Sequence, residues 1–271
     1  IVEKPAATSP ALYAELVDIA ERNGLILAMS LIEGVLAREA SRIVSEGVLG
    51  RIYGINYMWM DYQRWRRRDT MDWVYSKNDA GGGMLGHEFC HAVHRMRRMV
   101  GKEVSEVTGF ADVVSGEPLE VEDSISMSMR FVDGSIGTLH GGSWGPSVEK
   151  ITPQSRRALL HTFNIWGEKG ALHGSIDENR LISDIRYEDP PVPGENNLGS
   201  VKRIRPPKIR RTETTMTGEI QPEAFFEACL GAIQGKGAPP ISNHDGLRFL
   251  EIQHALYRAT ETARFQLLNQ G

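Results

Sequence analysis

The chain has 271 residues, a formal net charge of −4, 41% hydrophobic residues and 24% charged residues. These values are ordinary for a globular protein, and the length favours one or two domains. The negative net charge argues against a general nucleic-acid binder, and no apolar run is long enough to span a membrane. Two cysteines, Cys90 and Cys229, are too few for a disulfide framework, so we expect a protein of the reducing cytoplasm.

The N-terminal residues predict a strand, a helix and a second strand. Residues 1–2 are typical of the tail of a buried strand, and Ser9 followed by Pro10 is typical of a helix N-terminus. Gly24 ends the helix, and residues 25–29 form an apolar run of strand length. This order is typical of a doubly wound parallel sheet. The helical repeat is carried by Leu12, Leu16, Ile19 and Ala20.

A second helix, over residues 35–44 and closed by Gly47, leads into a segment of different character. Alternate residues from Tyr53 to Trp59 are aromatic or apolar, which predicts one extended strand. A polar loop rich in tryptophan and arginine follows over residues 61–80. Its basic cluster, most simply a solvated loop or an anion contact, is Arg64, Arg66, Arg67 and Arg68.

The middle of the chain is dominated by strand patterns. The strongest hairpin signal is the tight turn at Asp133-Gly134, which separates two strand-like runs. Residues 188–219 are rich in Pro, Gly, Arg and Thr, and we expect a long excursion there. The predicted strands are 104–114, 125–131, 135–144, 163–166 and 171–176.

Helices return at residues 222–234 and 245–268. Antiparallel strands with helices elsewhere in the chain predict an α+β domain with an open sheet and helices on one face. The expected buried stripe of the last helix is Phe249, Ile252, Leu256, Ala259 and Ala263.

The stretch with the clearest chemical content is the glycine triplet 81–83 followed by His87, His91 and His94. The histidine offsets place three imidazoles along one face of a helix. Glycines let the backbone approach a ligand or another backbone closely, and histidine suits both proton transfer and metal binding. We therefore take this segment as a site candidate; the alternative is a packed helix whose histidines are merely hydrogen-bonded.

Five motifs, in this order, resemble those of one enzyme family. They are Glu3-Lys4-Pro5, Gly47-Val48-Leu49-Gly50-Arg51-Ile52, Gly81-Gly82-Gly83 with His91, Glu122-Asp123-Ser124, and Asp245-Gly246-Leu247. The chain resembles the Gfo/Idh/MocA family, the glucose-fructose oxidoreductase and inositol dehydrogenase group of NAD(P)-dependent enzymes. Each motif is weak alone, and the ordered set is more specific.

The resemblance implies two domains. Residues 1–31 would be the tail of a Rossmann-type parallel sheet, and residues 32–271 a substrate-binding domain whose sheet builds homodimers or tetramers. NAD or NADP would be the cofactor, contacted by Glu3, Lys4 and Pro5. The substrate would be a sugar, polyol or related small cyclic alcohol. Lys4 would be the general acid/base, because hydride transfer at a carbinol needs a group that takes the hydroxyl proton, and His91 would contact the substrate hydroxyls.

The chain departs from the family pattern in two ways. His87 stands where the family has a carboxylate, and Phe89 stands where it has a glycine, so substrate preference is open. No Gly-x-Gly-x-x-Gly follows a strand, because the glycines of 81–86 have neither a preceding strand nor an acidic ribose partner. We therefore expect most of the cofactor domain to lie ahead of Ile1, and this chain alone to bind NAD(H) weakly.

Two other readings remain open. His87-Glu88-Phe89-Cys90-His91 is a literal His-Glu-x-x-His, in which two imidazoles would bind zinc and Glu88 would act as the general base of a hydrolase. His94 or Cys90 would then add a ligand. The other reading is a non-catalytic remnant that only oligomerises.

Three structural expectations follow. The Lys4–Pro5 bond is a candidate for cis geometry, because only proline makes the cis form accessible at low cost. The helix should leave the site by His94. The uncovered face of the sheet should carry Met127, Met129 or their neighbours and mediate self-association.

Overall fold

Within the residues that the computed structural model describes, nine strands form one sheet in the order β8-β7-β6-β5-β1-β4-β3-β2-β9. β1 and β4 are parallel, and the other neighbouring pairs are antiparallel. The predicted open, mostly antiparallel sheet is therefore confirmed. The described residues are 1–60, 73–143, 160–176, 180–187, 208–215, 222–262 and 266–267.

Most of the helices and strands lie in the predicted order along the chain. The strands are β1 Ile52–Met60, β2 Val104–Asp112, β3 Ser124–Phe131, β4 Ile136–Gly142, β5 Leu160–Gly167, β6 Gly170–Ser175, β7 Arg180–Tyr187, β8 Lys208–Thr215 and β9 Gln266–Leu267. The helices are α1 Pro10–Arg22, α2 Val35–Ser45, α3 Lys77–Ala80, α4 Cys90–Val100, α5 Pro222–Ile233 and α6 Asn243–Thr262. A short 3-10 turn spans Trp73–Tyr75, and a π-helix spans Leu85–Phe89.

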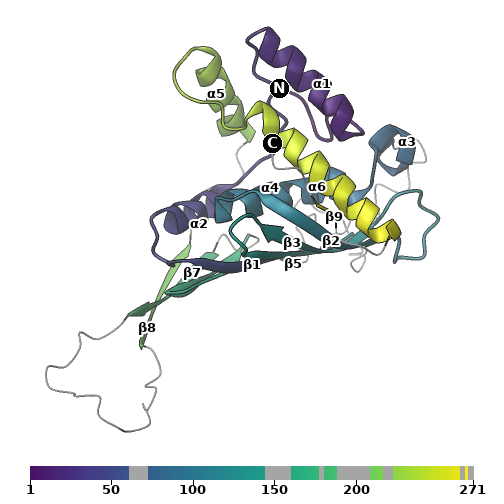
Figure 1. The fold of residues 1–271 in the computed structure, drawn as a ribbon. Coiled ribbons are helices and arrows are strands. Elements are labelled where there is room, and N and C mark those ends of the chain that lie inside the picture. The colour runs from purple at the N-terminus through teal and green to yellow at the C-terminus, as the bar shows by residue number, and fades with distance from the viewer. Residues whose placement is uncertain are drawn as a thin grey trace, which may run out of the picture.

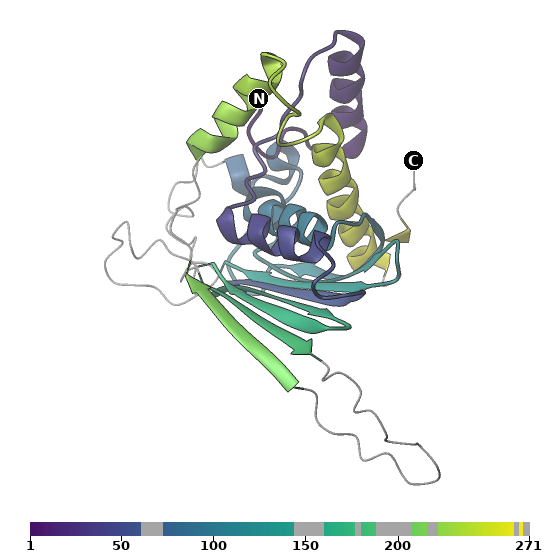
Figure 2. The ribbon, with the colours of Figure 1, turned by 90° about the vertical axis from the view of Figure 1, so that its left-hand side faces the viewer.

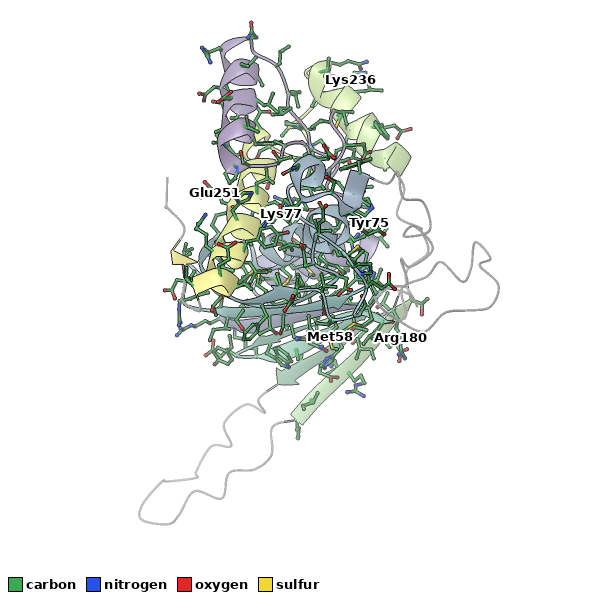
Figure 3. The ribbon with its side chains drawn as sticks, turned by 90° about the vertical axis from the view of Figure 1, so that its right-hand side faces the viewer. Met58, Tyr75, Lys77, Arg180, Lys236 and Glu251 are labelled. Carbon is green, nitrogen blue, oxygen red and sulfur yellow. The ribbon has the colours of Figure 1, made fainter. Side chains whose placement is uncertain are left out.

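The helices lie on one face of the sheet and leave the other face open (Figures 1 and 2). α4 packs on β1 and β4, α6 packs on β2, and α1 packs on α6. The side chains between these layers fill the interior (Figure 3). The largest buried apolar groups there include Tyr57, Phe89, Phe131, Phe163 and Phe249.

The N-terminal unit is less regular than expected. The helix is confirmed, with the Ser9 hydroxyl accepting from the Leu12 N–H at 3.3 Å. The two flanking strands reduce to one parallel bridge between Val2 and Met29, because no further residues pair beside them in the described chain. Of the residues that carry the helical repeat, Leu12, Leu16 and Ile19 are exposed and Ala20 is buried; the other buried residues of α1 are Tyr13 and Val17.

Three strands, β7, β8 and the short β9, lie where no strand was predicted. β8 falls inside the expected excursion 188–219 and pairs with β7, and the Arg211 guanidinium bridges both carboxylate oxygens of Asp184 at 2.7 Å. All residues of β8 are exposed, so the alternation that marks a half-buried strand is missing. The rest of the excursion, and the cluster Arg64, Arg66, Arg67 and Arg68, lie outside the described residues.

Two details at the end of the chain and on the sheet also differ. α6 ends at Thr262, and Gln266–Leu267 add β9 beside β2. Four of the five expected stripe residues of α6 are buried, and Ala263 lies outside the described residues. Met127 and Met129 are buried under the helices, so the open face of β3 carries Ser126, Ser128 and Arg130 instead.

In the part of the chain that the structure describes, no helix combines the length and apolar character needed to cross a membrane. Cys90 and Cys229 are both buried free thiols.

Candidate active site

The chain enters the site region through the N-terminal bridge. The Val2 N–H donates to the Ala28 carbonyl at 2.9 Å, and the Ser30 N–H donates to the Val2 carbonyl at 3.0 Å. The Ser30 hydroxyl donates to a carboxylate oxygen of Glu3 at 2.9 Å. These bonds fix the main chain immediately before Lys4.

Lys4 points toward the histidine segment. The Lys4–Pro5 peptide bond is cis, as predicted. The Lys4 ammonium donates to the main-chain carbonyl of His87, and the residue is partly buried. Lys4 is therefore held against the protein beside His87.

The glycine triplet forms the turn between α3 and the π-helix. Gly81 has a φ of +70° and ends α3, a backbone conformation that favours glycine. At Gly83 a side chain would collide with the main-chain carbonyl of Glu122. Because the triplet follows a helix and not a strand, it lacks the strand–turn–helix context of a dinucleotide-binding turn, as predicted.

Glu122 anchors the start of the π-helix. Its buried carboxylate accepts from the N–H groups of Gly83 at 2.8 Å and Leu85 at 3.0 Å, and from the Tyr257 hydroxyl at 2.9 Å. Burial raises the pKa of Glu122. The carboxylate satisfies two N–H groups that have no partner within the helix, so it fixes the backbone that presents His87. From the sequence, Glu122 was identified only as part of a motif and was not expected to be a site residue.

Lys4 lies near the imidazole of His91, and it contacts His87 through the main-chain carbonyl. His87 lies within the π-helix, and its Nε2 is 3.4 Å from a carboxylate oxygen of Glu88. His91 is in the first turn of α4, and its Nδ1 accepts from the Ile32 N–H at 3.2 Å. Burial, followed by the positive charge of Lys4, lowers the pKa of His91 well below its ordinary value. His91 is therefore a neutral imidazole near neutral pH.

His94 does not share this environment. It is fully buried, with Nε2 3.8 Å from a Glu33 carboxylate oxygen and Nδ1 3.9 Å from one of Asp245. Burial lowers the pKa of His94 to about 3. The three imidazoles thus do not converge on one ligand position, because His94 lies between Glu33, in the segment before α2, and Asp245 of α6.

An aromatic cluster of Trp59, Phe89 and His161 packs beside α4, and Trp59 and His161 were not predicted as site residues from the sequence. Trp59 stacks on His161 with ring centroids 4.0 Å apart. The rings of Trp59 and Phe89 pack in a T-shaped arrangement with their centroids 5.8 Å apart. Phe89, a departure from the family pattern, packs against Gly141, where a Cβ would lie 2.7 Å from its ring. Only the alternation of β1 pointed to Trp59, and no signal in the sequence pointed to His161.

A metal centre gains no support from this geometry. Among the described residues, no three His, Cys, Asp or Glu side chains form a group that could hold a metal ion. Burial raises the pKa of Cys90 to about 12, so its thiol stays protonated and is a poor ligand. Nδ1 of His91 is already taken by the Ile32 N–H.

A cavity of about 380 Å³ lies on another side of the glycine triplet, between β2 and α6. Its lining includes Gly82, Glu122 and Tyr257, but not Lys4, His87 or His91.

Comparison with known proteins identifies the family of this chain. Residues 37–173 match the model of the GFO/IDH/MocA C-terminal domain. A levoglucosan dehydrogenase from Pseudarthrobacter phenanthrenivorans is 26% identical over 155 residues, which cover 49% of this chain and only 37% of that relative. A 1,5-anhydro-D-fructose reductase from Ensifer adhaerens is 21% identical over 282 residues, which cover 100% of this chain and 73% of the reductase.

Solved structures agree on the fold. A levoglucosan dehydrogenase in complex with NADH has a TM-score of 0.76 at 17% identity, covering 99% of this chain and 73% of that chain. An oxidoreductase domain protein from Kribbella flavida has a TM-score of 0.78 at 17% identity, with the same two coverages. At these identities the likeness establishes the fold alone. Because the family model spans just over half of the 271 residues, the chain belongs to the GFO/IDH/MocA family.

Proposed function

We propose that the protein is an NAD(P)-dependent oxidoreductase that acts on a hydroxyl of a sugar, polyol or related small cyclic alcohol. The observation that carries the proposal is the contact of the Lys4 ammonium with the His87 carbonyl, less than two helical turns from the neutral imidazole of His91. The relatives named as a levoglucosan dehydrogenase and a 1,5-anhydro-D-fructose reductase support this substrate class.

The residues of this chain fit one end of such a cofactor. Lys4 lies at the end of the parallel bridge and is partly buried, which suits a position beside a nicotinamide ring. The turn and helix N-terminus that normally hold a pyrophosphate have no counterpart at Gly81–Gly86, which follow α3. Glu3, Lys4 and Pro5 are thus the residues that would line the nicotinamide end.

The chemistry assigned to the chain is proton transfer and orientation. When bound, NAD(P)⁺ supplies the acceptor for the hydride that leaves the carbinol carbon. Lys4 takes the hydroxyl proton in oxidation and returns it in reduction, as a general acid/base. His91 contacts the same or a neighbouring substrate oxygen, and His87 contributes to substrate choice. A group in the Lys4 role typically contributes about 10²- to 10⁴-fold in rate.

Residues 1–31 belong, in this proposal, to the nucleotide-binding domain, and residues 32–271 form the substrate domain. The parallel bridge of Val2 with Met29 is the expected pairing for such a domain. The exposed face of α1, with Leu12 49% and Ile19 51% exposed, offers an apolar surface for further packing in that domain.

The test is a pair of lysine variants in the complete protein. Lys4→Met should lower kcat about 10²- to 10⁴-fold with a panel of sugars and polyols, measured by the absorbance of reduced nicotinamide. Lys236→Met, at an exposed position, is the matched control and should keep full activity. Equal activity of the two variants would refute the role of Lys4.

Cofactor binding separates this function from its alternatives. The complete protein should bind NAD⁺ or NADP⁺ in calorimetry, whereas the 271-residue chain alone should bind weakly, since the described residues contain no counterpart of the pyrophosphate site. A complete protein that binds neither nucleotide would favour the non-catalytic remnant. Stoichiometric zinc in the purified protein, with Glu88 essential and Lys4 dispensable, would favour the hydrolase.

Self-association through the open face of the sheet completes the proposal. Ile136 and Trp166 flank Gly54 on neighbouring strands and are 49% and 44% exposed. A two-fold contact between sheets would bury such a row. Light scattering at micromolar concentration should give a dimer or tetramer, and Trp166→Arg should shift it toward monomer; a monomeric unmodified protein would contradict the assignment.

A further inference from the structure

Ile32, at the start of the substrate domain, is held at both of its main-chain polar groups by α4. Its N–H donates to Nδ1 of His91 at 3.2 Å. Its carbonyl accepts from Nε of Arg95 at 3.1 Å. His91 and Arg95 are four residues apart and therefore lie on the same face of the helix. One face of α4 thus clamps the chain where it passes from the N-terminal unit into the sheet domain.

Arg95 is itself fixed from below. Its side chain is buried, with 2% exposed, and its Nη1 donates to the Tyr57 hydroxyl at 3.1 Å and to Nε2 of His161 at 3.2 Å. Its guanidinium carbon lies 5.7 Å from the ring centroid of Trp59. The planar, fork-shaped guanidinium can donate hydrogen bonds to Tyr57 of β1, His161 of β5 and the Ile32 carbonyl at the same time, which a lysine ammonium would do less well.

The contact with Ile32 determines which nitrogen of His91 carries the proton. A neutral imidazole has one N–H and one acceptor nitrogen. Because Nδ1 of His91 accepts the Ile32 N–H, the proton lies on Nε2. The nitrogen left for a ligand is therefore a donor.

We propose that Arg95 is a positioning residue: by fixing Ile32 it holds His91 as the Nε2–H tautomer, so that His91 donates a hydrogen bond to a substrate oxygen and does not act as a base. The substrate half of this statement rests on the proposed function. It leaves proton transfer to Lys4, because a nitrogen that already bears its proton cannot accept the hydroxyl proton. His91 then stabilises negative charge that develops on the reacting or a neighbouring oxygen.

The tautomer can be tested directly by NMR on the 271-residue chain with ¹⁵N-labelled histidine, with the signals of His91 assigned by comparison with His91→Gln. At neutral pH, long-range ¹H–¹⁵N correlations should show His91 protonated at Nε2 and unprotonated at Nδ1. A proton on Nδ1 in the unmodified chain would overturn the proposal whatever the protein's activity.

Three variants test the part played by Arg95. Arg95→Met should give a mixture of His91 tautomers, and Arg95→Lys, which keeps a donor toward Ile32, should largely restore the single tautomer. Tyr57→Phe removes one anchor of the guanidinium while keeping the ring, and it replaces Arg95→Met if that variant does not fold. A folded Arg95→Met or Tyr57→Phe variant with an unchanged, pure Nε2–H tautomer would reduce Arg95 to a structural role and contradict the proposal.

Kinetics of the complete protein give the second readout. Arg95→Met should lower kcat about 10-fold while KM changes less than about 3-fold, because the lost alignment acts on a bond made in the transition state. A change confined to KM would contradict positioning for the chemical step. If the unmodified protein showed no oxidoreductase activity at all, the proposed function would fail, while the NMR result would still decide the tautomer.

Discussion

The two halves of the segment from Gly81 to Val100 are held in different ways. The first half, which runs to His91, is fixed mainly through main-chain groups: Glu122 binds two of its N–H groups, and Lys4 binds the His87 carbonyl. The second half is fixed through its own side chains, by the hydrogen bonds of Arg95 and by the ion pairs of Arg97. The Arg97 guanidinium binds both carboxylate oxygens of Glu103, at 3.0 and 2.7 Å, and an oxygen of Asp245 at 3.2 Å.

In the proposed function, this difference separates the half of the element that would contact a substrate from the half that stabilises the fold. Where the backbone is the point of attachment, side chains such as His91 keep a ring nitrogen for a ligand. Where side chains are the point of attachment, as at Arg97, their polar atoms are consumed within the protein. The π-helix lies in the first half, in keeping with the frequent occurrence of such turns at functional sites.

The largest expected effect compares one histidine from each half. His91→Ala should lower kcat/KM about 30- to 1000-fold, since one well-placed hydrogen bond in the transition state is worth about 2–4 kcal/mol. His94→Ala should instead lower the free energy of unfolding, because the imidazole is fully buried, and change kcat/KM less than about 3-fold. Steady-state kinetics and denaturant unfolding of both variants measure the contrast. A larger kinetic effect at His94 would erase the distinction between the halves.

The second test breaks the ion pairs. Arg97→Met should lower the free energy of unfolding by about 2 kcal/mol, because Arg97 is only 6% exposed and binds two carboxylates. Arg98→Met is the matched control: Arg98 is 53% exposed beside Glu33, and its loss should cost less than about 1 kcal/mol. Urea unfolding measures both. Equal losses in the two variants would mean that the buried pairs add nothing to the second half.

The third test uses pH. Burial lowers the pKa of His94 from 6.5 to about 3 in the folded protein, so below the ordinary value the unfolded chain binds one more proton at this position. Stability is then fully present above about pH 6.5 and falls as the pH drops, by at most about 1.4 kcal/mol per pH unit for one proton. His94→Asn should make the fall in the free energy of unfolding between about pH 7 and about pH 5 shallower, by up to about 1.4 kcal/mol per pH unit. An unchanged slope in urea unfolding would show that His94 is not the group responsible.

Local patterns were enough to predict most of the fold. The alternation of β3, the Asp133-Gly134 turn and the Ser9-Pro10 helix start all act over a few residues, and each was placed correctly. β8 was missed because an exposed edge strand has no buried face to produce alternation. The helical repeat predicted α1 but not the side that it buries, which carries Tyr13 and Val17, because its partner helix, α6, is distant in the sequence.

Around the candidate site, a local feature of the backbone was predictable, whereas contacts between distant residues were not. The cis Lys4–Pro5 bond was predicted from its proline, and the spacing of the histidines marked a candidate segment whose His87 carbonyl the structure brings to the Lys4 ammonium. The partnership of Arg95 with Ile32 joins residues 63 positions apart, and that of Tyr257 with Glu122 joins residues 135 apart. Such contacts follow from the three-dimensional fold and leave no periodic signal in the sequence.

The smallest expected effect on the overall rate is at His87, in the first half of the segment. Its backbone is already committed, since the N–H donates to Gly83 at 3.1 Å and the carbonyl accepts from Lys4. A substitution that keeps the backbone should therefore leave the segment in place and change only the side chain offered to a ligand. His87→Asp restores the carboxylate found in the family pattern and puts a negative charge beside Glu88, whose carboxylate lies 3.4 Å from the imidazole.

The expected outcome of His87→Asp is a change in preference and not in overall rate. Ratios of kcat/KM among sugars and polyols should shift by about 10-fold, the size of one hydrogen bond gained or lost at a hydroxyl, while the best kcat falls less than that. His87→Asn, which has a similar shape without the charge, separates the effect of charge from that of hydrogen bonding. If both variants kept the original order of substrates, His87 would serve only through its backbone, and His91 would remain as the side chain of the first half that is proposed to contact the substrate.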